Sequence, residues 1–335
     1  MRKRPTALFA LDGRHLPLLF PPDVAAALAD LVDIDPALAV TDFAAPELGP
    51  LLPGVEVLVT GWGCPRLTPA VLEALPRLRA VLHTGGTVKK LLHPEVWERG
   101  IAVSSAAAAN ALPVAEYTLG MILLSGKGVF AAREAYRAAE ALPPQRELGD
   151  IGNAGRRVGI VGASRIGRRV VELLRPFDFE VLLHDPYVSE DEARALGVRP
   201  AALPELLATC SIVSVHAPAT PETRHMIDAA GLALLPDGAV LINTARGSLV
   251  DTEALVAELR TGRIRAVLDV TEPEPLPPGS PLFRLPNAFL TPHIAGSLGN
   301  ELRRLGLAAV QEADRLLAGQ PLAHPVARDE LPHSA

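Results

Sequence analysis

The sequence of 335 residues has little cysteine and offers no cluster of metal-binding side chains. Its two cysteines, Cys64 and Cys210, cannot form the disulfide framework of a small secreted domain. No C-x-x-C pair is present, which excludes the common zinc and redox motifs. Such cysteine usage indicates a reducing compartment, so we expect a cytoplasmic protein without a metal site.

The sequence also lacks an excess of positive charge and a long hydrophobic run. Lys and Arg number 32 against 38 Asp and Glu, a net charge of −6, which argues against a nucleic-acid surface. The apolar run near the N-terminus, Ala7–Leu11, is too short for a signal peptide. The longest apolar candidate, Leu119–Leu124, falls short of the roughly 20 residues of a membrane span. We therefore expect neither a nucleic-acid partner nor a membrane.

What the sequence has is aliphatic strands that alternate with helical patterns. Hydrophobic residues make up 49% of the chain but aromatic residues only 4%, so the core is aliphatic. Val55–Gly61 and Leu78–Gly86 read as strands that end in glycine loops, with a helix capped by Thr68 between them. A polar segment, Ala141–Gly155, interrupts the alternation, and an amphipathic helix from Ser297 ends it. This order predicts an α/β protein of two domains.

The loop GASRIG at Gly162–Gly167 nearly matches the dinucleotide fingerprint G-x-G-x-x-G. A buried strand precedes it and an amphipathic helix follows, as the fingerprint requires. The middle glycine, which lets the backbone approach a pyrophosphate, is replaced by Ser164, and a serine can serve there if its φ is negative. The loop predicts a dinucleotide site; a strand-to-helix packing turn without ligand is the alternative.

Asp185 ends the second strand of the same βαβ unit. It stands at the distance from the glycine loop at which an acidic residue reaches the adenosine ribose. A carboxylate there accepts hydrogen bonds from the ribose hydroxyls and repels a 2′-phosphate. Asp185 therefore favours NAD over NADP.

Two later loops carry polar side chains at the carboxyl ends of strands, where ligands bind in open α/β sheets. His216 ends a strand in SIVSVHAPATPETRHMI, although a lone histidine is more often structural. Arg246 lies in NTARG, after the strand Ala239–Ile242 and before a helix capped by Asp251. Because arginine binds carboxylates bidentately, Arg246 is a candidate anion ligand; a surface arginine is the alternative.

A proline-rich loop and a last short strand bring further titratable residues to the same edge. A strand ends at Asp269, the loop after it carries Glu272 and Glu274, and His293 follows the last strand. The spacing allows Glu274 to fold back toward His293. A carboxylate beside an imidazole favours the protonated ring and fixes its tautomer, as a general acid/base requires. The alternative is that both glutamates are merely solvated.

Together these segments resemble the D-isomer-specific 2-hydroxyacid dehydrogenase family over nearly the whole chain. NALPVAEYTLGMIL resembles the interdomain helix of that family, and HAPATPETRHMI resembles its cofactor loop. NTARG, LDVTEPEPL and TPHIAG resemble its three signature segments in order. An ordered set of this kind is far more specific than the glycine loop alone.

The resemblance implies two Rossmann-like α/β domains with doubly wound parallel sheets and an active site in the cleft. The substrate domain would be discontinuous, residues 1–108 and 298–335, and residues 109–297 would bind NAD. The resemblance also implies a homodimer formed through the cofactor domains, with the apolar helix Val114–Leu124 and the segment Ala141–Gly155 as the contact.

The resemblance further implies a role for each site residue. Arg246 would bind the substrate carboxylate and carbonyl, and His293, with Glu274 as its partner, would exchange a proton with the carbonyl. Gly85 and Gly86 would offer backbone N–H groups to the carboxylate, and Asp269 would contact the nicotinamide end. The implied cofactor contacts are Gly162, Ser164, Arg165, Ile166, Gly167, Asp185, His216, Ala217, Pro218, Thr223, Thr244, Ala245, Arg246, Asp269, His293, Ala295 and Gly296.

The function implied is hydride transfer between NAD(H) and C2 of a small 2-hydroxy or 2-keto acid. The chain departs from the common family pattern at Ser164, at Thr271, where an aromatic residue is frequent, and in the substrate loop HTGGTVKKL. Lys89 and Lys90 in that loop either bind a second anionic group or are solvated surface. Whether Trp62 contacts the substrate stays open.

Two rival functions use the same fold. One is a non-enzymatic, NAD(H)-sensing protein of the corepressor type, and the other is a phosphite or formate dehydrogenase. Fold alone does not separate them from a 2-hydroxyacid dehydrogenase. The complete set of Arg246, Glu274 and His293 favours an enzyme.

Overall fold

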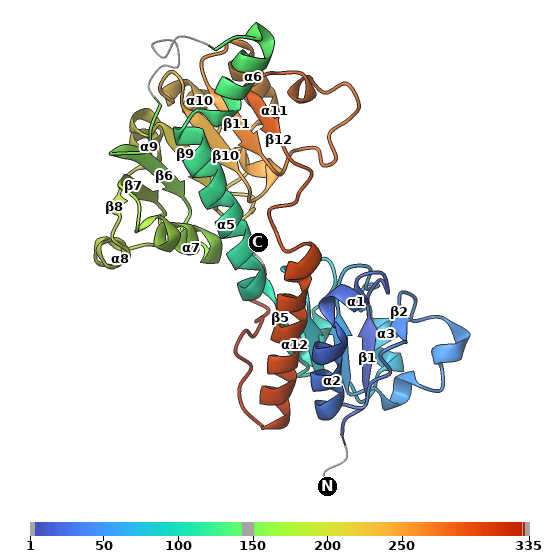
Figure 1. Cartoon of the computed structure of the whole chain (residues 1–335). Helices are drawn as coiled ribbons and strands as arrows, with labels where there is room; N and C mark the ends of the chain where they lie inside the picture. Colours follow the sequence, from blue (N-terminus) through green and yellow to red (C-terminus); the bar gives the residue numbers. More distant parts are fainter. Residues whose placement is uncertain (1–3, 143–150, 330, 332–335) are drawn as a thin grey trace. The chain divides into compact units, whose positions relative to one another are not determined.

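The computed structural model describes residues 4–142, 151–329 and 331 (Figure 1). The chain divides into two compact units, each built on a parallel sheet covered by helices. Unit 1 comprises Met1–Asn110 and Ser297–Ala335, and unit 2 comprises Ala111–Gly296. The predicted α/β class with two parallel sheets is confirmed.

Unit 1 has a five-stranded parallel sheet in the order β2-β1-β3-β4-β5. The strands are β1 (Ala7–Ala10), β2 (Ala39–Val40), β3 (Val57–Thr60), β4 (Ala80–His83) and β5 (Ala102–Ser105). The helices are α1 (Leu16–Leu19), α2 (Pro22–Leu31), α3 (Pro69–Ala74), α4 (Glu95–Glu98) and α12 (Leu302–Leu317). Strands β1, β3 and β4 are buried along their whole length, which explains their continuous apolar sequences.

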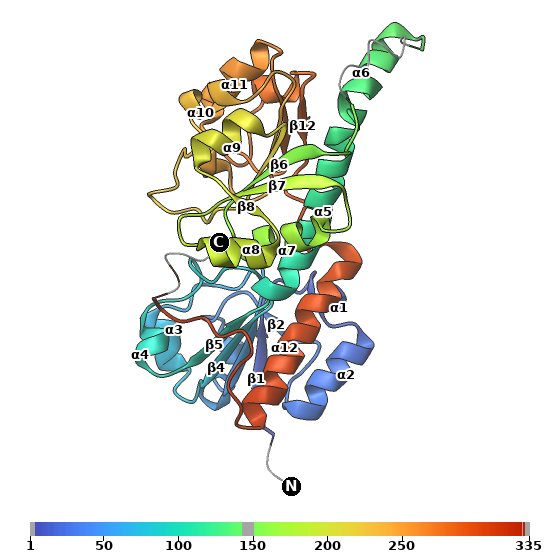
Figure 2. The ribbon, with the colours of Figure 1, turned by 90° about the vertical axis from the view of Figure 1, so that its left-hand side faces the viewer.

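The last helix of the chain completes unit 1 by packing beside its first helices. Figures 1 and 2 show α12 alongside α1 and α2. Leu302, Leu305 and Ala309 of α12 are buried in a cluster with Leu19 and Val24. Residues from the two ends of the sequence therefore share one hydrophobic core.

Two helix starts in unit 1 test the predicted caps. Thr68 caps α3 as predicted, since its side chain accepts a hydrogen bond from Val71 N. Ser297, however, does not cap α12, which begins at Leu302. The backbone N–H of Ser297 donates to Asn110 Oδ1 at 2.8 Å. Gly299, at φ 55°, breaks the chain direction between Ser297 and the helix, so the prediction for Ser297 is wrong.

Unit 2 has a seven-stranded parallel sheet in the order β12-β11-β10-β9-β6-β7-β8. The strands are β6 (Arg156–Val161), β7 (Phe179–His184), β8 (Arg199–Pro200), β9 (Ile212–Val215), β10 (Val240–Asn243), β11 (Arg265–Leu268) and β12 (Ala288–Leu290). The helices are α5 (Ala107–Gly126), whose first turn belongs to unit 1, α6 (Val129–Ala139), α7 (Arg165–Leu174), α8 (Glu190–Leu196), α9 (Leu203–Thr209), α10 (Ala229–Leu234) and α11 (Thr252–Arg260).

Helices cover both faces of the unit 2 sheet. One core cluster contains side chains of α5, α7 and α8, and the other contains side chains of α9, α10 and α11. Figure 2 shows the ribbons of these helices around the sheet. The chain runs from β6 outward to β7 and β8, then returns to β9 on the other side of β6. The carboxyl ends of β6 and β9 therefore form the topological switch point, the usual place for a ligand in such sheets.

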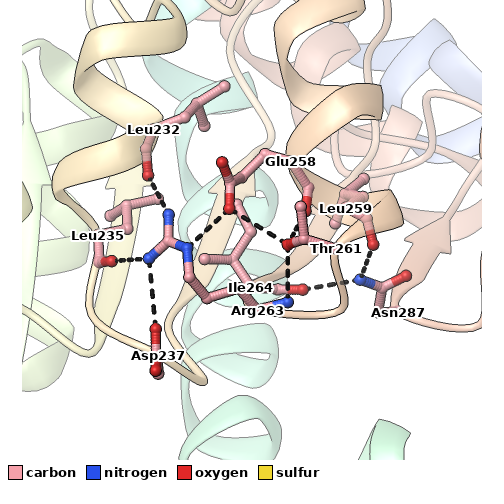
Figure 3. Close-up of polar contacts among 9 residues, drawn as sticks. All are labelled: Leu232, Leu235, Asp237, Glu258, Leu259, Thr261, Arg263, Ile264 and Asn287. Atoms are coloured by element: carbon pink, nitrogen blue, oxygen red, sulfur yellow. Dashed lines mark hydrogen bonds and ion pairs between the residues drawn. The ribbon is translucent and has the colours of Figure 1, made fainter.

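Arg263 ties α10 to α11 on one face of this sheet (Figure 3). Its Nη1 and Nη2 donate to the carbonyls of Leu235 and Leu232 at the end of α10, and its Nε donates to Glu258 of α11 at 2.7 Å. A cation at a helix C-terminus satisfies carbonyls that have no partner within the helix. This cluster has a structural role and holds the two helices beside β10 and β11.

The sequence suggested that the apolar stretch at Leu119–Leu124 is too short to span a membrane, but this stretch belongs to helix α5, which has 20 residues. Among the described residues it is the one helix long and apolar enough, by length and composition, to cross a membrane, and 33% of its most apolar window is buried. The core helix of a globular domain satisfies the same criteria. Tyr117 and Thr118 of α5 form hydrogen bonds with loops of unit 2, as expected of a helix packed in that unit. Most of the predicted connecting segment after it, residues 143–150, lies outside the described residues.

Candidate active site

The glycine loop connects β6 to α7 and packs tightly against neighbouring backbone segments of the same chain. Gly162 has φ 100°, and a Cβ atom there would lie 2.5 Å from the backbone N of Ala217. A Cβ atom on Gly167 would overlap the carbonyl oxygen of Gly162. Both positions therefore require glycine, and the loop packs backbone against backbone as the dinucleotide fingerprint does.

Ser164 has a different environment from the two glycines. Its φ is −61°, which any residue adopts, and it is the N-cap of α7. Its Oγ accepts a hydrogen bond from Gly167 N at 3.3 Å, while Arg165 and Ile166 form the first turn of the helix. The hydroxyl proton remains available to a ligand, because the cap uses only the oxygen as an acceptor. The serine is therefore compatible with a phosphate site at this helix N-terminus.

We expect Ser164→Gly to keep the affinity for NADH within about tenfold, the equivalent of one hydrogen bond. Glycine is itself an acceptable N-cap and costs only a few tenths of a kcal/mol relative to serine. Calorimetric titration with NADH measures the change. Ser189→Gly is the matched control, because Ser189 caps α8 in the same way. A much larger loss in Ser164→Gly alone would make its hydroxyl a principal phosphate ligand.

Asp185 is oriented toward the glycine loop by its own hydrogen bonds. Its Oδ2 accepts from Ala163 N at 2.7 Å, and its Oδ1 accepts from Tyr187 N at 2.9 Å. Each carboxylate oxygen can accept a second hydrogen bond. The half-buried carboxylate thus fits a ribose with two free hydroxyls beside the loop.

His216 packs against the glycine loop at Gly167. It is buried, its Nε2 lies 2.9 Å from Ser214 Oγ, and burial lowers its pKa to about 3. A Cβ atom on Gly167 would lie 3.3 Å from His216 Cβ. The imidazole is therefore neutral and packed into the structure. After it, Ala217 walls the glycine loop, and Thr223 Oγ1 closes the next turn by donating to the Pro218 carbonyl at 2.6 Å.

The NTARG segment after β10 holds Arg246 in a closed loop. The side chain of Asn243 donates through Nδ2 to the Arg246 carbonyl at 2.8 Å and accepts from Ala245 N at 3.0 Å. A Cβ atom on Gly247 would overlap the backbone of Thr271, so this loop packs directly on the loop after β11. Burial lowers the pKa of Arg246, and the negative charge of Glu274 opposes that shift. The guanidinium stays charged, because the ordinary pKa of arginine is far above neutral pH.

The structure brings Glu274 and His293 into direct contact. His293 Nδ1 lies 2.5 Å from Glu274 Oε1, and both side chains are accessible to solvent. Because Nδ1 faces the carboxylate, the proton on Nδ1 is shared with Glu274 and Nε2 is left for a reacting group. Glu272 has other partners: it lies 2.7 Å from Arg224 and 3.1 Å from His225. Neither glutamate is simply solvated: Glu274 faces the imidazole of His293, and Glu272 faces that of His225.

Asp269 shapes the loop that carries His293. It is buried, and its carboxylate accepts hydrogen bonds from Thr291 Oγ1 at 2.5 Å, Ile294 N at 2.8 Å and Ala295 N at 2.9 Å. Its own carbonyl accepts from His293 N at 3.0 Å. The loop from Thr291 to Gly296 is thereby folded around one carboxylate. The sequence indicated Asp269 as a ligand of the cofactor but not as the centre of this loop.

In unit 1, Gly85 and Gly86 follow β4 and a buried histidine. His83 Nδ1 lies 3.0 Å from Thr60 Oγ1, and burial lowers the pKa of His83 to about 4. A Cβ atom on Gly85 would lie 2.5 Å from His83 Nε2, so this position needs glycine. Trp62 is 41% exposed and its ring centroid lies 5.5 Å from that of His15.

The polar residues that complete the unit 2 site were not indicated by the sequence. They are Asn243, Thr291, Tyr117 and Thr118, whose side chains form the hydrogen bonds that hold these loops together. The part of the chain that the structure describes contains no group of three or more His, Cys, Asp or Glu side chains placed to hold a metal ion.

Comparison with known sequences identifies a family profile within unit 2. The profile described as "D-isomer specific 2-hydroxyacid dehydrogenase, NAD binding domain" matches residues 119–295. The match contains the glycine loop, Asp185 and all three residues of the Arg246, Glu274 and His293 set.

Individual relatives extend the similarity to unit 1. The chain is 31% identical to D-3-phosphoglycerate dehydrogenase of Methanocaldococcus jannaschii over 82% of its own length and 52% of that protein. It is 34% identical to glyoxylate reductase of Thermofilum pendens over 76% of each chain. The crystal structure of a phosphoglycerate oxidoreductase from Rhizobium etli, 26% identical, matches with a TM-score of 0.83 over 97% of this chain and 99% of that chain. The chain spans about half the length of the curated phosphoglycerate dehydrogenases it matches.

Proposed function

Because the chain belongs to the D-isomer specific 2-hydroxyacid dehydrogenase family, we propose that it transfers a hydride between NAD(H) and C2 of a small 2-hydroxy or 2-keto acid. The observation that carries the proposal is the contact of 2.5 Å between His293 Nδ1 and Glu274 Oε1 in the same unit as Arg246. An acid/base pair and a carboxylate ligand are the groups that such a reaction needs from the protein.

The residues of unit 2 fit the cofactor that the family binds. The glycine loop offers the α7 N-terminus, with Ser164, Arg165 and Ile166, to a pyrophosphate, and Asp185 offers its carboxylate to a ribose. We propose the following further contacts near the nicotinamide end and the adjoining loops: His216, Ala217, Pro218, Thr223, Thr244, Ala245, Asp269, Ala295 and Gly296. When bound, the nicotinamide supplies or accepts the hydride.

The protein's own groups bind the acid and move the proton. Arg246 binds the carboxylate of the substrate. We propose unit 1 as the substrate domain, with the backbone N–H groups of Gly85 and Gly86 as substrate contacts of that unit. His293 donates the proton on Nε2 to the carbonyl oxygen in reduction and takes the hydroxyl proton in oxidation. Glu274, through its contact with Nδ1, stabilises the protonated imidazole in both directions.

We expect Glu274→Gln to lower kcat of keto-acid reduction by roughly tenfold, the equivalent of one hydrogen bond. The carboxylate only accepts hydrogen bonds, so at 2.5 Å from Nδ1 it fixes the orientation and the tautomer of the His293 ring. A glutamine amide can donate as well as accept, so it fixes the ring less well. Stopped-flow assays with a saturating amount of NADH measure kcat.

Glu272→Gln is the matched control for that rate, because Glu272 faces Arg224 and His225 instead of His293. It should keep the wild-type kcat. An unchanged kcat in Glu274→Gln would show that the two side chains do not interact during the reaction.

A screen of NADH oxidation against small 2-keto acids tests the proposed function. Glyoxylate comes first, because it is the substrate in the name of the Thermofilum pendens relative. Reduction of NAD with phosphite and formate tests the rival dehydrogenases in parallel. Tight NADH binding without turnover of any of these compounds would instead support the sensing function.

We also propose a homodimer in the cytoplasm, with no nucleic-acid or membrane partner. The end of α5 and the start of α6 expose Leu124 and Val129, which supports a contact between two copies there. The free cysteines Cys64 and Cys210 are compatible with a reducing compartment. Light scattering of the purified protein measures the oligomeric state.

A further inference from the structure

Two adjacent hydroxyl groups of α5 reach the two loops that carry the proposed catalytic residues. Tyr117 Oη lies 2.7 Å from Thr291 Oγ1, and Thr118 Oγ1 lies 3.0 Å from Thr244 Oγ1. Thr291 stands two residues before His293, and Thr244 stands two residues before Arg246. One helix therefore contacts both loops at the same position relative to the functional side chain.

The contact of Tyr117 continues into the His293 loop as a directed chain of hydrogen bonds. The Thr291 hydroxyl donates to Asp269 Oδ1 at 2.5 Å, so its oxygen accepts the proton of Tyr117. Asp269 in turn accepts from the backbone N–H groups of Ile294 and Ala295. The Tyr117 hydroxyl thus fixes the carboxylate around which the loop is folded.

The contact of Thr118 is equally directed. Its hydroxyl donates to the Val114 carbonyl at 2.8 Å within α5, so its oxygen accepts the proton of Thr244. Both threonines are buried. Beside Thr244, the Asn243 side chain holds Ala245 N and the Arg246 carbonyl. The Arg246 loop is therefore anchored to α5 through Thr244 and closed by Asn243.

The hydrogen bond of Thr118 is buried and that of Tyr117 is partly buried, so both constrain the loops more strongly than the exposed ion pairs around them. The Arg224–Glu272 pair, which also reaches the loop of Glu274, has side chains 53% and 33% exposed. Solvent screens such pairs, and their contribution is small. A buried hydroxyl that loses its partner stays unsatisfied in a region of low dielectric, which makes its loss costly.

We propose that Tyr117 and Thr118 are positioning residues for the reaction, Tyr117 through the His293 loop and Thr118 through the Arg246 loop. The proposal rests on the proposed function for its kinetic part. Because the two residues are adjacent on one helix, they also fix the two loops relative to each other. A displaced proton donor lowers the rate of the chemical step, whereas a displaced carboxylate ligand weakens substrate binding.

For Tyr117→Phe we expect kcat of keto-acid reduction to fall about tenfold, the equivalent of one hydrogen bond, while KM changes less than about threefold. In the protein without cofactor, amide hydrogen exchange at Ile294 and Ala295 accelerates, because Asp269 loses its fixed orientation. Tyr136→Phe is the matched control, since it removes the hydroxyl of an exposed tyrosine on α6. It should leave both kcat and the exchange rates unchanged.

For Thr118→Val we expect the opposite division: KM for the keto acid rises about tenfold and kcat changes less than about threefold. Amide exchange at Ala245 accelerates in the protein without cofactor. Thr209→Val is the matched control, because the Thr209 hydroxyl also donates to a carbonyl one helical turn earlier, that of Glu205, but at the surface.

The exchange measurements separate this proposal from the proposed function. Suppose that none of the 2-keto acids supports NADH oxidation by the wild-type protein, but amide exchange accelerates in the two variants. The proposed function then fails and the anchoring of the loops stands. Wild-type exchange together with wild-type kinetics in both variants overturns the proposal. Equal losses of kcat, NADH binding and thermal stability in either variant also overturn it, because they indicate a merely structural role.

Discussion

His293→Ala is expected to lower kcat of keto-acid reduction by roughly a thousandfold, within the usual range for loss of a general acid. The structure gives His293 one carboxylate partner on Nδ1, Glu274 Oε1 at 2.5 Å, which leaves Nε2 as the atom that exchanges the proton. The proposed contacts of the cofactor at Gly162, Gly167 and Asp185 are held by hydrogen bonds and packing that do not involve the His293 imidazole. The Kd of NADH should therefore stay within about threefold of wild type, a change of less than one hydrogen bond.

The matched control for His293→Ala is His225→Ala. His225 also lies beside a glutamate, 3.1 Å from Glu272, and also has a positive φ, but it does not face Glu274. Its loss should change kcat far less. Near-normal turnover in His293→Ala would remove this residue from the mechanism.

The sequence predicted the fold well because parallel strands leave a simple pattern. Strands buried on both faces are mostly aliphatic, as in β9, β10 and the last four residues of β6, which are buried throughout. Local polar chemistry is also readable where it acts within one turn, as with Asp251, whose side chain caps α11. Ser297 shows the limit, because its partner is Asn110, distant in sequence.

The charged residues of the candidate site were predictable from the sequence, but the residues that hold their loops in place were not. Arg246, Glu274 and His293 are charged or titratable residues in loops after strands, which is the pattern of ligand sites. Tyr117 and Thr118, in contrast, are ordinary residues of an apolar helix. Their partners lie 174 and 126 residues away in the sequence, and no spacing rule joins positions so far apart.

The apolar character of α5 has the same explanation. A helix that packs on a sheet face and contacts two loops carries many apolar side chains, and such a helix matches a membrane span by length and composition. What distinguishes it is the use of its few polar groups. The hydroxyls of Tyr117 and Thr118 are satisfied by Thr291 and Thr244 within unit 2. Composition alone does not contain that information.

Arg246→Lys is expected to raise KM for the keto acid by roughly a hundredfold, the equivalent of a lost charge-assisted hydrogen bond, with a smaller effect on kcat. Arg246 Nη1 already donates to the Ala245 carbonyl at 2.6 Å, and the planar guanidinium still has donors left for a bidentate carboxylate contact. A lysine ammonium has three donors and no planar fork, so it binds the same carboxylate as a point charge.

The pH dependence of KM sharpens this prediction. Burial lowers the pKa of Arg246, but the guanidinium starts so high that it stays protonated throughout the assay range. A lysine starts about two units lower, and the same burial lowers its pKa further. KM of Arg246→Lys should therefore rise as the pH increases, whereas KM of the wild type should not rise for this reason. Arg224→Lys, at an exposed arginine paired with Glu272, is the matched control and should keep the wild-type KM. Unchanged KM and kcat in Arg246→Lys would mean that another group binds the carboxylate.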